Sequence, residues 1–166
     1  MNEAHLHLVV NHFPIIATIL GFGILAAGVF RKNKIIMNTA YSVFIVAAIF
    51  SAVSMATGDG AEEMVENMPS IGKHIIHEHE EMAEKLALLL YVLGTISIVG
   101  IVFNNKDHKN QNIVAYLALF LATCGIVLGA LTGTTGGEIR HTEIRSNQLQ
   151  NIEYKANDVE KTRDKD

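Results

Sequence analysis

The sequence LALLLYVLGTISIVGIVFNN, residues 86–105, contains no Asp, Glu, Lys or Arg. A helix needs about 20 predominantly apolar residues to cross the hydrocarbon core of a bilayer. Three further stretches lack these charged residues over a similar or greater length, namely residues 4–30, 35–58 and 110–137. The sequence therefore predicts an all-α integral membrane protein, a four-helix bundle with spans at about residues 8–30, 35–57, 80–104 and 112–133.

The chain has 166 residues, of which 49% are hydrophobic, and a formal net charge of −4. This length suits one membrane bundle at residues 1–141, followed by a polar C-terminal tail at residues 142–166. The negative charge argues against a nucleic-acid partner, which requires a basic surface. The sequence has no Ser/His/Asp constellation, phosphate-binding loop or GxGxxG motif, so we favour an electron carrier or accessory protein over an independent enzyme.

Basic residues mark two of the three connections between the spans. The first connection contains Arg31, Lys32 and Lys34, and the third contains Lys106 and Lys109. The positive-inside rule places such connections in the cytoplasm. We therefore expect a multi-pass protein of the bacterial inner (cytoplasmic) membrane, in the lipid bilayer, with both termini on the outer, periplasmic side.

An even number of spans places seven of the eight histidines on the periplasmic face and only His108 on the other. The seven are His5, His7, His12, His74, His77, His79 and His141. Imidazole is a common ligand of metal ions and haem iron and also carries protons. The histidine-rich face is therefore the predicted location of function.

Helical periodicity separates the histidines near the third span. Residues three, four and seven positions apart share one face of a helix. His79 shares its face with Leu86 and Leu90, so we expect its side chain to point into the bundle. His74 and His77 fall on the opposite face, which we expect to be solvated.

Helical periodicity also predicts the orientation of His12 at the start of the first span. We expect Asn11 to be its N-cap and His12 to lie in its first turn. The face that follows His12 carries Ile16, Ile19, Gly23, Ala26 and Phe30. Its small residues are typical of helix packing in membranes, so His12 is also expected to point inward. His5 and His7 precede the cap and are expected to be less constrained.

Glycine-rich turns are expected to end the second and fourth spans. The second should stop at the Thr-Gly-Asp-Gly sequence of residues 57–60, before a separate short helix at residues 60–67. Another helix should begin near Ile71 and continue through His79 into the third span. The fourth ends in TGTTGG at residues 132–137, so that His141 follows a break.

Three histidines from different segments, His12, His79 and His141, are therefore expected at one level of the outer interface. The carboxylates of Glu63 and Glu138 are predicted to lie at the same level. Imidazole and carboxylate ligands suit zinc, iron or copper, so these five side chains form a candidate metal site. The alternative is a set of interfacial residues that are hydrogen-bonded to water and to one another.

Four short motifs suggest a family: NHFP at residues 11–14, TGDGAEE at 57–63, HEE at 79–81 and GGEIRH at 136–141. They resemble an uncharacterised family of small four-helix bacterial membrane proteins, a domain of unknown function with a His-Phe-Pro signature. The resemblance covers roughly residues 5–145 and favours the same three histidines. Some relatives are joined to c-type cytochrome domains, which implies a redox setting, although this chain has no CxxCH for covalent haem attachment.

The predicted function is electron transfer by a b-type haem at the outer face. His12 and His79 would be the axial ligands, and His141 or Arg140 would contact the propionates, with His141 also an alternative ligand. A periplasmic cytochrome or quinol would exchange electrons with the haem. Two alternatives remain: an outer-face transition-metal site, or a non-catalytic accessory subunit of a larger membrane complex or homo-oligomer.

Overall fold

The structure, a computed structural model, describes residues 2–66 and 72–145 of the chain. The described part consists of five α-helices and one short 3₁₀-helix, with no strand. The elements are α1 (Glu3–Val10), α2 (Phe13–Phe30), α3 (Lys34–Val65), α4 (Lys73–Asn105), α5 (Gln111–Arg140) and η1 (Thr142–Ile144). The all-α prediction is confirmed.

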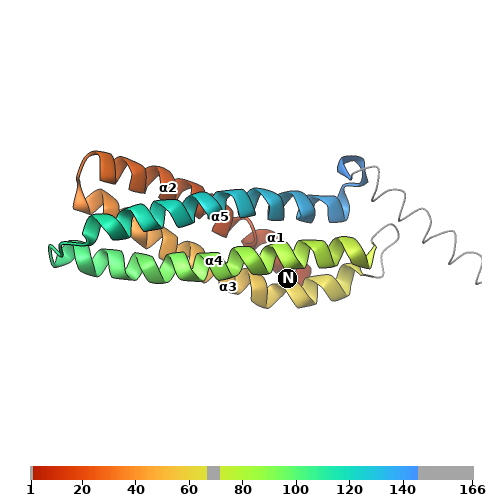
Figure 1. Cartoon of the computed structure of the whole chain (residues 1–166). Coiled ribbons are helices and arrows are strands. Elements are labelled where there is room, and N and C mark those ends of the chain that lie inside the picture. Colours follow the sequence, from red (N-terminus) through yellow and green to blue (C-terminus); the bar gives the residue numbers. More distant parts are fainter. Residues whose placement is uncertain (1, 67–71, 146–166) are drawn as a thin grey trace, which may run out of the picture.

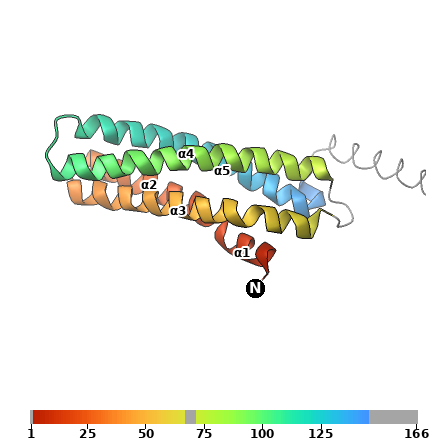
Figure 2. The same cartoon turned by 90° about the horizontal axis from the view of Figure 1, so that it is seen from below.

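Four helices run alongside one another as an elongated antiparallel bundle (Figure 1). α3 packs between α2 and α4, and α5 packs against both α4 and α2, so these helices enclose one core. The chain turns from α2 to α3 and from α4 to α5 at one end, which we call the loop end. The start of α4 and the last turns of α5 lie at the opposite end, the histidine end (Figures 1 and 2).

Four segments are long and apolar enough to cross a membrane: Glu3–Phe30, which comprises α1 and α2, and the helices α3, α4 and α5. Their outward surfaces carry large apolar side chains, including Phe30 (89% exposed), Leu88 (67%) and Phe120 (64%). Exposed apolar surface of this extent indicates contact with lipid. The predicted integral membrane four-helix bundle is therefore confirmed, whereas the side of the membrane on which each end lies stays a prediction.

The core contains large side chains that pack against glycines on neighbouring helices. Tyr41 and Phe44 of α3 are fully buried. A Cβ added at Gly100 of α4 would lie 2.5 Å from Tyr41 Cζ, and one at Gly21 of α2 would lie 2.5 Å from Phe44 Cε1. Only glycine permits these contacts, which bring the helix backbones close together.

The predicted end of the second span at residues 57–60 is wrong, and so is the separate short helix at residues 60–67. α3 continues without interruption from Lys34 to Val65. A glycine inside a helix costs only about 1 kcal/mol relative to alanine, so packing can outweigh it. Here the glycines face α1: the side chain of Glu3 occupies the space that a Cβ of Gly60 would fill.

The start of the first span also differs from the prediction. Residues 3–10 form α1, which Asn2 caps by accepting a hydrogen bond from the backbone N–H of His5. Asn11 is the C-cap of α1, and His12 is the N-cap of α2. Pro14 explains the break, because proline lacks an N–H group and its ring clashes with the carbonyl of a preceding helical turn. In Figure 2, α1 leaves the line of α2 and lies below α3, the helix with which it packs.

α4 starts at Lys73 and passes through His79 into the third span as expected, while Ile71 lies outside the described residues. The predicted break of the fourth span at residues 132–137 is wrong, because α5 continues as a helix through all six residues and ends at Arg140. Arg145 is buried there and folds back onto the end of α5, donating hydrogen bonds to the carbonyls of Glu138 (2.7 Å) and Ile139 (3.0 Å).

Candidate functional site: a paired-histidine site

His12 does not point into the bundle, so its predicted orientation is wrong. Its side chain is exposed, and two residues of the face that follows it, Ile16 (53% exposed) and Ile19 (48%), also face outward. The inward face of α2 instead carries Pro14, Thr18, Gly21, Leu25 and Gly28. α2 is apolar all round, and such a helix gives no reliable hydrophobic face.

His79 lies on the inward side of α4, as predicted. Its ring is partly buried, and Nδ1 lies 3.2 Å from Thr135 Oγ1 on α5. The next residue of α5, Gly136, leaves room for the ring, since a Cβ there would lie 2.9 Å from His79 Cε1. The Thr135 hydroxyl donates its hydrogen to the Thr132 carbonyl (3.1 Å). With its hydrogen on that carbonyl, the hydroxyl oxygen is free to accept from Nδ1–H of His79 in the tautomer that carries the hydrogen there.

The expectation that His7 is less constrained is wrong, because His7 is the second partly buried histidine of this region. Its Nδ1 lies 3.1 Å from the Ser54 carbonyl and 3.2 Å from Thr57 Oγ1, both on α3. A carbonyl can only accept, so Nδ1 of His7 carries the hydrogen. The Thr57 hydroxyl donates to backbone carbonyls of its own helix and accepts from the same Nδ1–H.

His7 and His79 lie within electrostatic range of each other, although they are on different helices. Both neutral rings carry their hydrogen on Nδ1, where the hydrogen bonds hold it. Nε2 of each ring then has a free lone pair. The His79 ring also bonds to the backbone of Thr132, and the side-chain hydrogen bonds described above use Nδ1 of each ring. The two rings form what we call the paired-histidine site.

Among the other predicted ligands, His12 lies within electrostatic range of His7, although its side chain is exposed. His141 is exposed at the C-cap of α5, with Nδ1 3.0 Å from Glu143 Oε1. The backbone N–H of Glu143, and next the His141 imidazole, lower the pKa of the Glu143 carboxyl. Within residues 2–66 and 72–145, no group of three or more His, Cys, Asp or Glu side chains is placed to hold a metal ion.

The remaining predicted site residues also occupy the histidine end. Glu63 is exposed near the end of α3, and Arg140 is exposed in the last turn of α5. The side chain of Glu138 is partly buried, and its backbone carbonyl accepts the hydrogen bond from Arg145. The roles of His12, His141, Arg140, Glu63 and Glu138 as ligands or cofactor contacts stay predictions.

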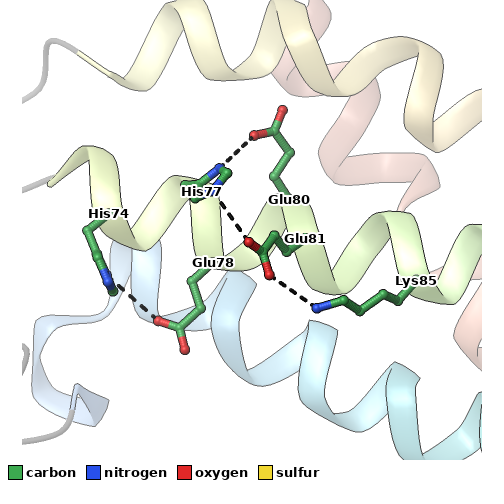
Figure 3. Close-up of polar contacts among 6 residues, drawn as sticks. All are labelled: His74, His77, Glu78, Glu80, Glu81 and Lys85. Carbon is green, nitrogen blue, oxygen red and sulfur yellow. Dashed lines mark hydrogen bonds and ion pairs between the residues drawn. The ribbon is translucent and has the colours of Figure 1, made fainter.

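The exposed face of the first turns of α4 carries a separate group of charged side chains (Figure 3). His77 lies 3.7 Å from Glu80 and 3.4 Å from Glu81, while Lys85 donates to Glu81 at 3.1 Å. His74 lies 4.0 Å from Glu78. Figure 3 shows these pairs along one helix surface, at the spacings that join neighbouring turns. The predicted solvated face with His74 and His77 is confirmed.

The fold and the two rings together define a class of protein: an integral membrane four-helix bundle with a paired-histidine site near one end. The chain belongs to the family described as "Predicted membrane protein (DUF2231)", which matches residues 4–143. The predicted membership of a membrane family of unknown function is thereby confirmed. No curated protein and no solved structure matches the chain.

Proposed function

We propose that this membrane protein binds a b-type haem at the paired-histidine site and transfers electrons through it. His7 and His79 would hold the haem iron, so that His7 takes the place predicted for His12. The proposal rests on a pattern of hydrogen bonding that both rings have in common. Each has its Nδ1–H bound to an oxygen atom and its Nε2 lone pair available.

This hydrogen bonding is typical of ligand histidines. A metal-bound imidazole nearly always donates its other N–H to a carboxylate, a carbonyl or water, which fixes the orientation of the ring. The Ser54 carbonyl supplies this partner for His7, and the Thr135 hydroxyl supplies it for His79. His74 and His77 instead face exposed carboxylates on their own helix.

The number of ligands favours haem over a bare metal ion. Haem iron needs only axial ligands from the protein, because the porphyrin supplies the other four. A zinc site takes three or four protein ligands. The paired-histidine site offers two imidazoles, and among the described residues no His, Cys, Asp or Glu side chain completes a group of three that could hold a metal ion. The experiment must therefore distinguish a bound haem from a bare transition-metal ion, which is the alternative.

The neighbourhood of the two rings contains small side chains, as a flat macrocycle requires. Gly136 lies against His79, and Gly58 lies near His7, where a Cβ would be 4.0 Å from Cε1. One turn before Gly136, a Cβ at Gly133 would meet no heavy atom of the described residues within 4 Å.

The residues of the chain would hold and orient the haem, and the bound group would supply a one-electron couple. Both rings are partly buried rather than fully enclosed, so electrons could pass to a partner at the membrane surface. In the orientation that the positive-inside rule predicts, this surface faces the periplasm of a bacterial inner membrane. A periplasmic cytochrome or a quinol is the proposed partner.

The test is a reduced-minus-oxidised visible spectrum of the detergent-purified full chain from haem-replete cells, with iron measured on the same sample. We expect the sharp reduced α-band of a b-type haem and stoichiometric iron. His7→Ala and His79→Ala should each lose the haem, whereas His74→Ala and His108→Ala should retain it. A colourless wild-type protein would contradict the proposal, and elemental analysis would then distinguish a metal site from an accessory subunit.

A further inference from the structure

The loop end of the bundle carries a concentration of positive charge at its two connections, from α2 to α3 and from α4 to α5. Both connections are short, at residues 31–33 and 106–110. Five basic residues lie in them or directly beside them, against a single acidic residue, Asp107. We call the five the basic patch; they are Arg31, Lys32, Lys34, Lys106 and Lys109.

Two sets of contacts join the connections into one surface. Lys34, the first residue of α3, forms an ion pair with Asp107 of the other connection. One turn further along α3, Asn38 donates to Asn105 Oδ1 at 2.9 Å and accepts from Asn104 Nδ2 at 2.9 Å. The basic patch is therefore one surface that both connections share, rather than two separate loops.

Four cations of the basic patch have no carboxylate partner among the described residues. Only Lys34 of this group forms an ion pair there. The other four are exposed, namely Arg31, Lys32, Lys106 and Lys109. Like charges that lie close together repel one another, so the binding of an anion at this surface lowers the electrostatic energy.

Apolar side chains indicate the depth of the basic patch in the membrane. Phe30, the last residue of α2, and Ile35, the second residue of α3, are both largely exposed. On spanning helices, large exposed apolar side chains contact lipid. Arg31 and Lys34 directly adjoin these two residues, so the patch lies where the hydrocarbon core ends. The anions at this level are the phosphates of the lipid headgroups.

We propose that the basic patch binds the headgroups of anionic phospholipids. Clusters of about four to eight Lys and Arg residues beside a membrane span attract such lipids. The Arg31 guanidinium can bind a phosphate through two parallel hydrogen bonds, whereas the lysines act as point charges. A zwitterionic lipid carries its own cation beside the phosphate, so the patch favours lipids with a net negative charge. The site is independent of the haem proposal, because it lies at the opposite end of the bundle.

The test uses a tryptophan introduced beside the basic patch, because the chain contains none. Phe30→Trp places it next to Arg31, and lipids with brominated chains quench its fluorescence on contact. The full-length variant is reconstituted in mixed bilayers of phosphatidylglycerol and phosphatidylcholine, with either lipid brominated. One Lys or Arg near an anionic membrane surface changes affinity about fivefold, so we expect a preference for phosphatidylglycerol of at least about that size.

Paired charge removals test whether the basic patch causes this preference. In the Phe30→Trp protein, Arg31→Gln with Lys32→Gln should reduce the preference about fivefold or more. Lys73→Gln with Lys85→Gln removes two exposed cations from the histidine end and should leave it unchanged. Equal quenching by the two lipids would overturn the proposal and favour an acidic soluble partner. The same preference in both double variants would also overturn it.

Discussion

His7 and His79 differ from the other histidines in the atoms that fix their rings. Each Nδ1–H is held by an oxygen atom of another helix, from Ser54 and Thr57 for His7 and from Thr135 for His79. The Ser54 carbonyl can only accept, so His7 donates that bond, and the two hydroxyls also bond to carbonyls of their own helices. These bonds fix the orientation of both rings through Nδ1, so that Nε2 of each ring would be the atom that binds the iron.

A threonine substitution tests this orienting role. Thr135→Val removes the oxygen that accepts from His79 and nearly preserves the shape of the side chain. Loss of such an outer-shell partner typically lowers affinity 10- to 100-fold, so we expect a haem affinity that is weaker by roughly this factor. The measurement is a haem titration of the apoprotein, followed by absorbance.

Thr134→Val is the matched control for this substitution. Thr134 is the preceding residue, is exposed, and bonds only to the Ala130 carbonyl of its own helix at 3.0 Å. Its replacement should leave the haem affinity unchanged. Equal affinities for both variants would show that Thr135 does not position His79.

Among the helices, α1 differs most from the sequence prediction, which did not include a separate helix at residues 3–10. It packs along α3 beside the glycines at residues 58 and 60. The side chain of Glu3 lies directly against Gly60, and His7 lies one helical turn further along α1. The smooth surface that these glycines provide therefore allows α1 to approach, and the approach of α1 places His7.

A larger side chain at Gly60 should displace α1. A Cβ at this position would overlap the Glu3 carboxylate, so Gly60→Val should move α1 away from α3 and take His7 with it. We expect faster amide hydrogen exchange at residues 3–10 and a loss of bound haem. Asp59→Val, at the exposed preceding position, should change neither quantity. Unchanged exchange in Gly60→Val would mean that α1 does not depend on this contact.

The sequence predicts some elements well and others poorly, for physical reasons. The four spans were predictable because each is a long stretch without charges, and the inward orientation of His79 followed from the apolar residues on its face. The orientation of His12 failed because α2 has no polar face to set its phase. His7 was missed because its partners, Ser54 and Thr57, are distant in sequence, and local patterns contain no information on such contacts.

For the whole molecule, the distribution of charge separates the two ends of the bundle. The connections at the loop end are basic, whereas the histidine end carries most of the acidic residues of the described part. This asymmetry predicts a loop end in the cytoplasm and a paired-histidine site near the periplasm.

Cysteine labelling tests this orientation. After replacement of Cys124 by alanine, Glu63→Cys should react with a membrane-impermeant maleimide that is added to intact spheroplasts. Lys109→Cys should react only after permeabilisation, because it lies in the connection between α4 and α5. The reverse pattern would place the histidine end in the cytoplasm and would rule out a periplasmic electron partner.

Electron paramagnetic resonance of the oxidised full chain tests whether His7 and His79 together hold one haem iron. We expect a low-spin ferric haem signal from two imidazole ligands, which is lost in His7→Ala and in His79→Ala but unchanged in His77→Ala. A low-spin signal that survives the removal of either histidine, or the absence of a haem signal from haem-replete protein, would contradict it.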